Sequence, residues 1–408
     1  MSRRARYCLF ALSLAVAMPA GATAAGTPSL DLRYRHEHVD QDGLARTASA
    51  DTLRVRAGYS TAAWHGWSAL VEADGVLGLG DGGYNDTRNG LRQYPVVADR
   101  PGAELNQALL RHASGTHVAT FGRQRINLGN QRFVGGSGWR QNEQTYDAAR
   151  LQLGVQDRLS LDYSYVDGIN TVFGPDDSAA SSSANRSDIE GHSHLLQAAL
   201  RITPATSLMA YQYRLGLDDA AVTATAPPGT LSSRTDGLRL EGHRGDFGYA
   251  IEHARQRGLG GNPWRLDSRY RLVELAWTVR GATLKAGHES LGGGDGEGNR
   301  AFQTPLGTRH LFQGWADVFL TTPAQGVDDV YAGITVPLAG GSLQAWYHEF
   351  SPECGGGRYG HETDLSYARP LPGFERLAAL VKLARYRSDD ATRTRDTDKL
   401  WLQLQYAY

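Results

Sequence analysis

Residues 400–408 of the chain read LWLQLQYAY. One face of this segment carries Leu400, Leu402 and Leu404 followed by two tyrosines, and the other carries Trp401, two glutamines and an alanine. Successive side chains of a β-strand point to opposite faces, so this period of two predicts a strand with one apolar face. The aromatic Tyr408 is typical of the strand that closes an outer-membrane β-barrel, and we expect barrel-assembly machinery to recognise this strand.

Segments of about ten residues with the same alternation recur along the chain, as they do in barrels. An antiparallel β-sandwich or a propeller would alternate too, with the apolar face buried inward. Aromatic residues near segment ends, such as Tyr34, Tyr59 and Trp277, favour a membrane barrel instead. The side chains expected to face lipid include Leu53, Val55, Leu159, Leu161, Val273 and Leu275.

The connections between these segments are alternately short and long, and they allow the strands to be counted. Short turns are predicted near residues 62–66, 114–115, 156–157, 203–205, 244–245, 280–282, 338–341 and 370–373. Longer Gly/Asp/Ser-rich connections are predicted near 40–50, 78–103, 126–144, 168–189, 216–234, 256–266, 291–327, 352–360 and 388–397. Eight short turns and nine long loops predict an all-β, membrane-spanning antiparallel up-and-down barrel of about 18 strands, with short periplasmic turns and long extracellular loops.

One apolar segment, LFQGWADVFL at 311–320, could itself be a strand. A nineteenth strand would place the two termini on opposite sides of the membrane, so we assign this segment to the long loop 291–327. Trp315 and Phe319 are too apolar to lie free in solvent, and loops of this length are usually functional. We therefore expect segments within 78–103 and 291–327 to fold into or over the lumen and narrow it.

The N-terminal residues resemble a secretory signal rather than a membrane anchor. Arg3, Arg4 and Arg6 precede a short apolar stretch, and Ala22-Thr23-Ala24 forms a small-residue cleavage site. The predicted organisation is a signal peptide at 1–24 and one barrel domain at 25–408. Without the signal the chain has 39 basic and 43 acidic residues, a net charge of about −4, which argues against a nucleic-acid-binding protein.

Composition and motifs favour no enzyme and no metalloprotein. Only Cys354 remains after Cys8 leaves with the signal, and no Cys/His spacing resembles a zinc site. No GxSxG or HExxH motif is present, and no pair of carboxylates is singled out by its spacing. We therefore expect no catalytic residues, no metal and no cofactor, although a barrel enzyme or an adhesin stays open as an alternative.

Alternation places many charged residues on the predicted lumenal faces, because charge that faces lipid at mid-depth costs roughly 2–4 kcal/mol for Arg or Lys. Rings of basic residues favour anions, whereas interleaved carboxylates would form a ladder of ion pairs that only fills the lumen. Both interpretations remain open at this stage. The predicted pore-lining residues are Arg33, Arg54, Arg56, Asp74, Arg123, Arg125, Arg150, Asp162, Arg239 and Lys285.

Two long blocks carry a family resemblance: FGRQRINLGNQRFVGGSGWRQNEQTYD at 121–147 and AFQTPLGTRHLFQGWADVFLTTPAQGVDDVYAG at 301–333. Both are similar to characteristic segments of the alginate-export family of outer-membrane porins. The resemblance implies a monomeric 18-stranded barrel with an Arg-rich lumen that conducts anionic polysaccharide. It also implies that Arg123, Arg125 and Arg132 line the pore or anchor a loop. We expect the constriction to include Trp139, Arg140, Trp315 and Asp317.

The functional hypothesis is a channel in the bacterial outer membrane for alginate-like saccharides or related organic anions. Passage could run in either direction, and an uptake porin for small solutes is the main alternative. The expected partners are outer-membrane lipid, lipopolysaccharide, the barrel-assembly machinery and the anionic solute, with no nucleic acid.

Overall fold

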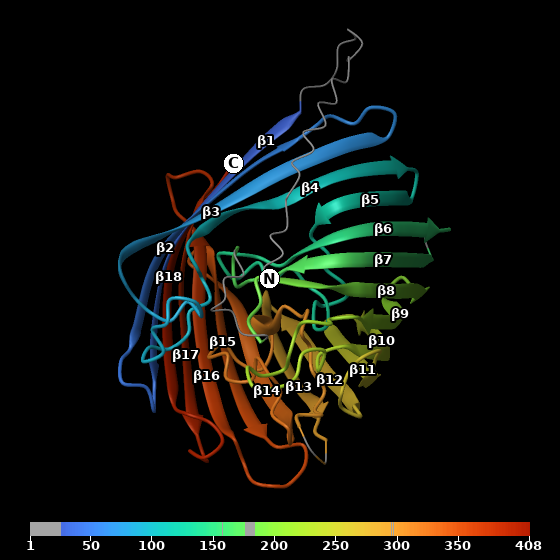
Figure 1. The fold of residues 1–408 in the computed structure, drawn as a ribbon. Coiled ribbons are helices and arrows are strands. Elements are labelled where there is room, and N and C mark those ends of the chain that lie inside the picture. Colours follow the sequence, from blue (N-terminus) through green and yellow to red (C-terminus); the bar gives the residue numbers. More distant parts are fainter. Residues whose placement is uncertain (1–25, 157, 176–183, 295, 297) are drawn as a thin grey trace, which may run out of the picture.

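The computed structural model describes residues 26–156, 158–175, 184–294, 296 and 298–408, so the predicted signal peptide lies outside the described residues. Eighteen antiparallel β-strands form one sheet that closes on itself (Figure 1). The strands are β1 (Thr27–Gln41), β2 (Ala48–Ser60), β3 (Trp67–Gly83), β4 (Gly102–Ser114), β5 (His117–Gln124), β6 (Thr145–Val155), β7 (Leu159–Asn170), β8 (Asp188–Thr203), β9 (Thr206–Leu215), β10 (Ser233–Arg244), β11 (Phe247–Gly258), β12 (Asp267–Val279), β13 (Ala282–Gly292), β14 (Gly326–Leu338), β15 (Gly341–Ser351), β16 (Gly360–Pro370), β17 (Leu377–Ser388) and β18 (Thr397–Ala407).

Closure of the sheet comes from the first and last strands. β1 pairs with β2 on one side and with β18 on the other, in a register that runs from Asp31 opposite Ala407 to Gln41 opposite Thr397. All other neighbours are consecutive in the sequence, as in an up-and-down barrel. Each described strand therefore has partners on both sides, which satisfies the backbone hydrogen bonds without an open edge.

The predicted count of 18 strands is confirmed, and so is the alternation of connections. Short turns join β2 to β3, β4 to β5 and each later pair of the same kind, and they all lie at one end of the barrel, the short-turn end. The segment 311–320 is part of the connection between β13 and β14, as predicted, and the described residues of that connection include the 3₁₀ helix η1 (Arg309–Leu311). The described residues include no helix long and apolar enough to cross a membrane.

The two faces of each strand differ as the alternation predicts. In β12, Val273 and Leu275 are 51% and 62% exposed, whereas Leu272 and Glu274 line a cavity inside the barrel. In β2, Leu53 and Val55 alternate with the inward-facing Arg54 and Arg56, and in β7 Leu159 and Leu161 alternate with Asp162. All six side chains predicted to face lipid lie on the outer face.

Long connections enter the barrel from the other end, the long-loop end, and pack against its inner wall. Loop 84–101 packs Tyr84 and Val97 on β1 and β2, and loop 293–325 packs Phe319 on Phe350, Tyr359 and Tyr386. The prediction that segments of 78–103 and 291–327 narrow the lumen is confirmed. Loop 125–144 enters as well and forms the largest apolar cluster with residues of β6–β9 and β11–β13 and with Leu217 and Ala220 of the connection between β9 and β10.

Candidate channel lumen and constriction

Arginines on the inner faces of β1 and β2 begin the site. Arg54 binds Asp31 on the neighbouring strand at 2.5 Å. Arg56 makes two hydrogen bonds to Asp74 of β3, at 2.6 and 2.5 Å, in the fork geometry that suits a guanidinium and a carboxylate. Because these groups lie on the same face of adjacent strands, alternation alone is enough to bring them together.

A β-bulge adds a further polar group to this wall. The register of β3 and β4 shifts between Glu72 and Ala73, so that Asn106 and Gln107 both point inward although they are adjacent in the sequence. Their amide nitrogens donate to Glu72 at 2.7 and 3.2 Å. Arg125 also donates to Glu72 and to Glu143, which belongs to loop 125–144. The bulge thus builds a carboxylate-centred anchor for the start of this loop.

The two sequence blocks that carry the family resemblance meet inside the barrel. Val134 and Leu306 form a short parallel bridge, and the Gly135 nitrogen donates to the Leu306 carbonyl at 2.8 Å. A side chain on Gly135 would lie 2.2 Å from Thr308 Oγ1, and one on Gly307 would lie 2.3 Å from the Arg132 carbonyl oxygen. Glycine at these two positions therefore allows the two loop backbones to touch.

Arg132 attaches this pair of loops to the opposite wall. Its side chain is buried, and its guanidinium donates to Glu289 of β13 at 2.7 Å and to Thr304 at 3.2 Å. Tyr270 of β12 donates to the same carboxylate at 2.8 Å. A buried charge that loses its partner is strongly destabilised, so the Arg132–Glu289 pair fixes the loops in one position. Arg132 is thus a loop anchor, one of the two roles that the resemblance implies.

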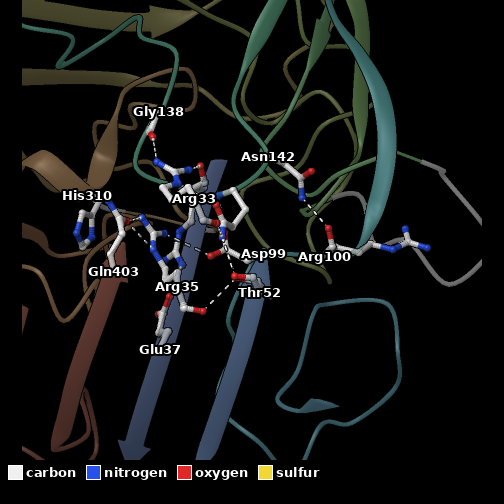
Figure 2. A network of polar contacts seen from close by, with 12 residues as sticks. Arg33, Arg35, Glu37, Thr52, Asp99, Arg100, Gly138, Asn142, His310 and Gln403 are labelled. Carbon is white, nitrogen blue, oxygen red and sulfur yellow. Dashed lines mark hydrogen bonds and ion pairs between the residues drawn. The ribbon is translucent and has the colours of Figure 1, made fainter. Parts of the chain in front are cut away.

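Arg33 of β1 holds the other side of loop 125–144. Its guanidinium donates to the Gly138 carbonyl at 2.9 Å, to the Arg140 carbonyl and to the Gln141 side chain at 2.8 Å (Figure 2). The Gln141 backbone nitrogen then donates to Asp99 of loop 84–101 at 2.8 Å, and the same aspartate lies 3.4 Å from Arg35. Two inward arginines of one strand therefore connect two loops.

Asp317 is the centre of the constriction. Its carboxylate accepts from Arg140 at 2.9 Å and from Lys399 of β18 at 3.0 Å, and it lies 2.7 Å from Nδ1 of His310. Arg140 also lies 3.3 Å from Glu37 of β1. The group joins loop 125–144, loop 293–325 and two wall strands through one buried carboxylate.

An aromatic layer lies directly beside this centre. Trp139 stacks on His310 with ring centroids 4.6 Å apart, and Arg35 lies 4.1 Å above the Trp139 ring. Lys382 of β17 lies 4.2 Å from the ring of Trp139 and 3.8 Å from that of Trp315. Such cation–π contacts are strongest where water is excluded, and Arg35 and Lys382 are both buried.

The hydrogen bonds define the protonation state of His310. Because an ionised Asp317 can only accept, Nδ1 carries the proton and donates to it, which leaves Nε2, 2.7 Å from Lys382 Nζ, as an acceptor. Burial lowers the pKa of His310 to about 3, which keeps the ring neutral. Burial alone would raise the pKa of Asp317, but the His310 hydrogen bond, Lys399 and Arg140 hold it well below its usual range. Asp317 therefore stays ionised.

Loop 293–325 is also docked through its backbone. The Ala316 nitrogen donates to Glu362 at 2.6 Å and the Trp315 nitrogen donates to Asp364 at 3.2 Å, both on the inner face of β16. Asp317 has φ of 62°, a left-handed conformation that Asp and Asn tolerate better than most residues. The wall carboxylates thus hold the residues that place Asp317 at the centre.

Several cavities remain around the loops. One of about 310 Å³ lies toward the long-loop end and is lined by Arg140, Arg309, Lys399 and Asp317. One of about 580 Å³ lies toward the short-turn end and is lined by Arg201, Arg239, Lys285, Glu241 and Glu274. A cavity of about 290 Å³ near the same end is lined by Arg111, Arg125 and Arg150, and one of about 280 Å³ carries Trp315, Tyr331 and Trp346.

Most predicted pore-lining residues do face the lumen, and carboxylates hold nearly all the basic ones. Arg150 donates to Asp162 at 2.6 Å, Arg239 to Glu252 at 2.7 Å, and Lys285 lies 2.9 Å from Glu274. The interpretation as paired ions thus describes much of the wall. The predicted residues found on the lumenal side are Arg33, Arg54, Arg56, Asp74, Arg125, Arg150, Asp162, Arg239 and Lys285, and Trp139, Arg140, Trp315 and Asp317 form the constriction.

Arg123 is the exception, and the predicted orientation of its side chain is wrong. Thr120 and Gln124 of β5 line a cavity, whereas Phe121 on the other face is 71% exposed, and Arg123 shares the face of Phe121. Its guanidinium binds Asp147 of β6 at 2.8 Å. Arg123 is the second-last residue of its strand, near the barrel rim, where a charge on the outer face costs only about 0–1 kcal/mol.

Several residues of the site were not selected from the sequence. Asp99 and Glu143 lie in loops, where alternation says nothing about direction. Lys382 and Lys399 are on inward faces of β17 and β18, and the same alternation that selected Arg54 could have selected them. Arg111 of β4 was not selected either; its side chain, like that of Arg201, lines a cavity and makes no hydrogen bond or ion pair to another described residue. Within the described ranges, no group of three or more His, Cys, Asp or Glu could hold a metal ion.

Sequence comparison decides the family. Residues 29–285, more than half of the chain, match the family described as alginate export. The chain belongs to the alginate-export family. The matched range includes the block at 121–147, with Trp139 and Arg140, and ends before the block at 301–333, which holds Trp315 and Asp317. No curated protein sequence matches this member of the family.

Solved structures share the fold of this alginate-export family member. OccK3 (OpdO) of Pseudomonas aeruginosa is 16% identical, with a TM-score of 0.68 over 94% of this chain and 95% of that chain. OccAB4 of Acinetobacter baumannii is 14% identical, with a TM-score of 0.70 over 95% and 99%. The P. aeruginosa outer-membrane protein opdK is 13% identical, with a TM-score of 0.68 over 94% and 98%. The fold is therefore that of outer-membrane porins.

Proposed function

We propose that this protein is a channel of the bacterial outer membrane through which anionic saccharides or related organic anions pass. The observation that carries the proposal is the charge that lines the cavities. Among the described residues that line the cavity toward the long-loop end, Arg140, Arg309 and Lys399 accompany one carboxylate, Asp317, and Arg140 also contacts Glu37 behind it. Such an excess of positive charge, enclosed by low-dielectric walls, concentrates anions and favours their passage.

The cavities toward the short-turn end support the same solute class. Arg111, Arg125 and Arg150 line one of them; Arg125 and Arg150 have carboxylate partners, so the uncompensated charge there is that of Arg111. In the largest of these cavities three cations accompany two carboxylates. The cavity beside Trp315 differs, because it is lined by aromatic rings and by slightly more acids than bases. Rings beside paired charges suit the apolar faces and hydroxyls of a sugar, so charge and shape together favour an acidic saccharide.

Uptake of small organic anions is the second candidate function, and cavity size favours it. The cavities of about 280 to 580 Å³ are of the size that holds small ligands, and three docked loops occupy the lumen between them. Export of a polymer would need these loops to move aside. We infer no catalytic role, and we propose a monomer whose partners are lipid, lipopolysaccharide and the barrel-assembly machinery.

Reversal potentials of single channels in a planar bilayer test the proposal. Under a tenfold KCl gradient the wild-type channel should prefer anions, and R111Q/R201Q should weaken that preference because it removes two lumenal cations that hold no carboxylate. R385Q is the matched control, since Arg385 is 69% exposed on the outer face of β17. A wild-type channel that prefers cations would refute the proposed solute class.

Current blockade by added solutes separates the two candidates. An export channel for polyanions should be blocked by oligouronates of increasing length with rising residence time. An uptake channel for small anions should bind mono- and diuronates or small dicarboxylates and show no gain with length.

A further inference from the structure

The outer face of β9–β12 carries a dense group of arginines near the long-loop end, here called the arginine surface. Strand pairing places Arg234 of β10 directly between Arg214 of β9 and Arg257 of β11. In the next row Arg255 lies opposite Arg269 of β12. These four strands are neighbours in the barrel wall (Figure 1). The surface consists of Arg214, Arg234, Arg255, Arg257, Arg269 and Arg271.

These side chains point away from the lumen. The alternate residues of the same strands, such as Tyr213, Thr235 and Tyr270, are buried against the loops inside the barrel. The guanidinium groups are open to the surroundings, with Arg234 and Arg255 each 42% and Arg271 58% exposed. The arginine surface is therefore available to a partner outside the barrel.

Carboxylates neutralise only part of this charge. Arg234 pairs with Asp236, Arg255 with Asp267, and Arg271 lies 3.6 Å from Glu353. The side chains of Arg214, Arg257 and Arg269 make no hydrogen bond or ion pair to another described residue, although Asp267, which Arg255 holds, lies directly opposite Arg257. Like charges directly opposite each other destabilise a sheet. The six arginines share these three carboxylates, so the surface carries an excess of positive charge that an anion would stabilise.

The position of the surface identifies the kind of anion. Leu238, Ile251 and Val273, further along the same outer faces, are about half exposed and belong to the apolar band. Arg255 and Arg269 lie four residues beyond Ile251 and Val273, about 13 Å at 3.3 Å per residue. The arginine surface thus begins where the apolar band ends, at the level of lipid headgroups.

Other parts of the outer rim do not share this pattern. On β17, Arg387 pairs with Asp398 at 2.8 Å and Arg385 lies 3.8 Å from the same aspartate. On β5, Arg123 is held by Asp147. Each of these arginines has a carboxylate partner, whereas in the arginine surface six arginines share three carboxylates. Positive charge without a partner is therefore concentrated on one wall.

We propose that the arginine surface binds the phosphate groups of lipopolysaccharide in the outer leaflet. A guanidinium matches two phosphate oxygens at once, and adjacent arginines can hold a multiply phosphorylated headgroup while its acyl chains lie on the apolar band. The inference rests on the proposed outer-membrane location, but it is independent of what passes through the lumen. A binding result and a transport result can therefore fail separately.

Native mass spectrometry of the purified full-length protein, titrated with bis-phosphorylated lipid A, tests the proposal. An arginine beside a charged lipid surface contributes about fivefold in affinity, so R214Q/R257Q/R269Q should weaken binding on the order of a hundredfold. The control R123Q/R385Q/R387Q removes three outer-face arginines elsewhere and should bind as the wild type does. R214K/R257K/R269K, which keeps charge but loses the fork, should bind with intermediate affinity.

Dephosphorylated lipid A completes the test. The proposal requires that wild-type protein bind it as weakly as the R214Q/R257Q/R269Q variant binds the phosphorylated form. Equal binding of both lipids, or equal loss in the control variant, would overturn the proposal. Self-association of the wild type that R214Q/R257Q/R269Q abolishes, with no lipid preference, would assign the surface to a second copy of this chain instead. Heat-modifiable migration on a gel verifies that every variant is a folded barrel.

Discussion

Arginines on the inner face of β1 and β2 and those on the outer face of β9–β12 lie in strands of the same geometry, but their surroundings are opposite. Arg35 is fully buried and contacts Asp99 and Trp139, whereas Arg271 is 58% exposed. Every inner arginine of β1 and β2 holds a carboxylate or a loop carbonyl. The comparison teaches that alternation selects the face of a side chain, and that the loops then decide what a lumenal arginine does.

The energetic difference follows from solvation. Removing a guanidinium from water is costly, so an inner arginine is stable only with partners of opposite charge or with several carbonyl groups. Arg33 uses carbonyl groups and a glutamine, and Arg56 uses carboxylates. An outer arginine near the rim keeps its water and needs no partner to be tolerated. Inner arginines therefore determine loop positions, and outer ones determine what the surface attracts.

The largest effect is expected at the centre of the inner network. Asp317→Asn keeps the size and the tolerance for positive φ but removes the charge that Arg140 and Lys399 share. Removing one partner of a buried ion pair costs roughly 3–5 kcal/mol. We expect loop 293–325 to leave the wall, with higher single-channel conductance and frequent current fluctuations in planar bilayers.

The matched control is Asp398→Asn, which removes a half-exposed aspartate that binds Arg387 on the outer face of β18. Exposed pairs contribute only about 0–1 kcal/mol, so conductance should stay at the wild-type value. Equal conductance of the wild type and Asp317→Asn would contradict the role given to Asp317.

The outer wall provides the second contrast, between rim and mid-depth. Arg271 and Leu275 share the outer face of β12. Arg271 lies near the rim, where an arginine is tolerated, and Leu275 lies in the apolar band. Leu275→Arg should destabilise the barrel by about 2–4 kcal/mol, because the new charge would lie in the apolar band. Urea-induced unfolding in lipid vesicles measures this cost. Arg271→Leu should change stability little, and a similar small effect for Leu275→Arg would refute the assigned depth.

The wall of the barrel could be predicted from the sequence because its rule is local. A period of two places Leu53 outside and Arg54 inside wherever the strand lies in the sheet. The same rule failed at Arg123, because charge was assumed to face inward at any depth, whereas the rim allows it outside. Lys382 and Lys399 obey the rule and could have been selected.

The interior of the lumen could be predicted only in part. Trp315 and Phe319 revealed by their apolar character that loop 293–325 must pack against something. Their partners on β15–β17 depend on contacts between residues distant in sequence, and no local pattern specifies those. The pairing of Arg132 with Glu289 joins residues 157 positions apart, and the bulge at Asn106 appears only when β3 and β4 are aligned.

Acid should weaken the inner network while the outer wall stays unchanged. The pKa of buried His310 is lowered to about 3, whereas a released His310 would titrate near 6.5. The released loop therefore binds more protons than the docked loop between these values, and docking weakens as pH falls from about 6.5 toward 3. Asp317 behaves differently, because docking lowers the pKa of its carboxyl group. Its contribution to the stability of the docked loop is therefore lost only when pH falls below about 4.

The measurement is the frequency of current fluctuations between pH 7 and pH 4. The groups that face His310 are Asp317, Lys382, Arg140 and Trp139. His310→Gln removes the titrating ring and should make the frequency depend less on pH in this range. A wild-type channel with the same frequency at both pH values would show that His310 is not released.

The smallest expected effect separates two arginines only two positions apart. Arg125 lies inside the barrel on Glu72 and Glu143, and Arg123 lies outside on Asp147. Arg125→Ala removes a lumenal cation and leaves two carboxylates less compensated, so the anion preference should fall by roughly a factor of two to five at low salt. Arg123→Ala should leave selectivity unchanged, because the barrel wall and the lipid separate that side chain from the lumen.

The reversal potential at about 0.01 M salt, where the Debye length is near 30 Å, gives the clearest difference between the two variants. At 1 M salt the Debye length falls to about 3 Å, and the two variants should become indistinguishable. A shift in selectivity from Arg123→Ala as large as that from Arg125→Ala would show that the faces of β5 have been assigned wrongly, and the contrast between inner and outer arginines would fail at this strand.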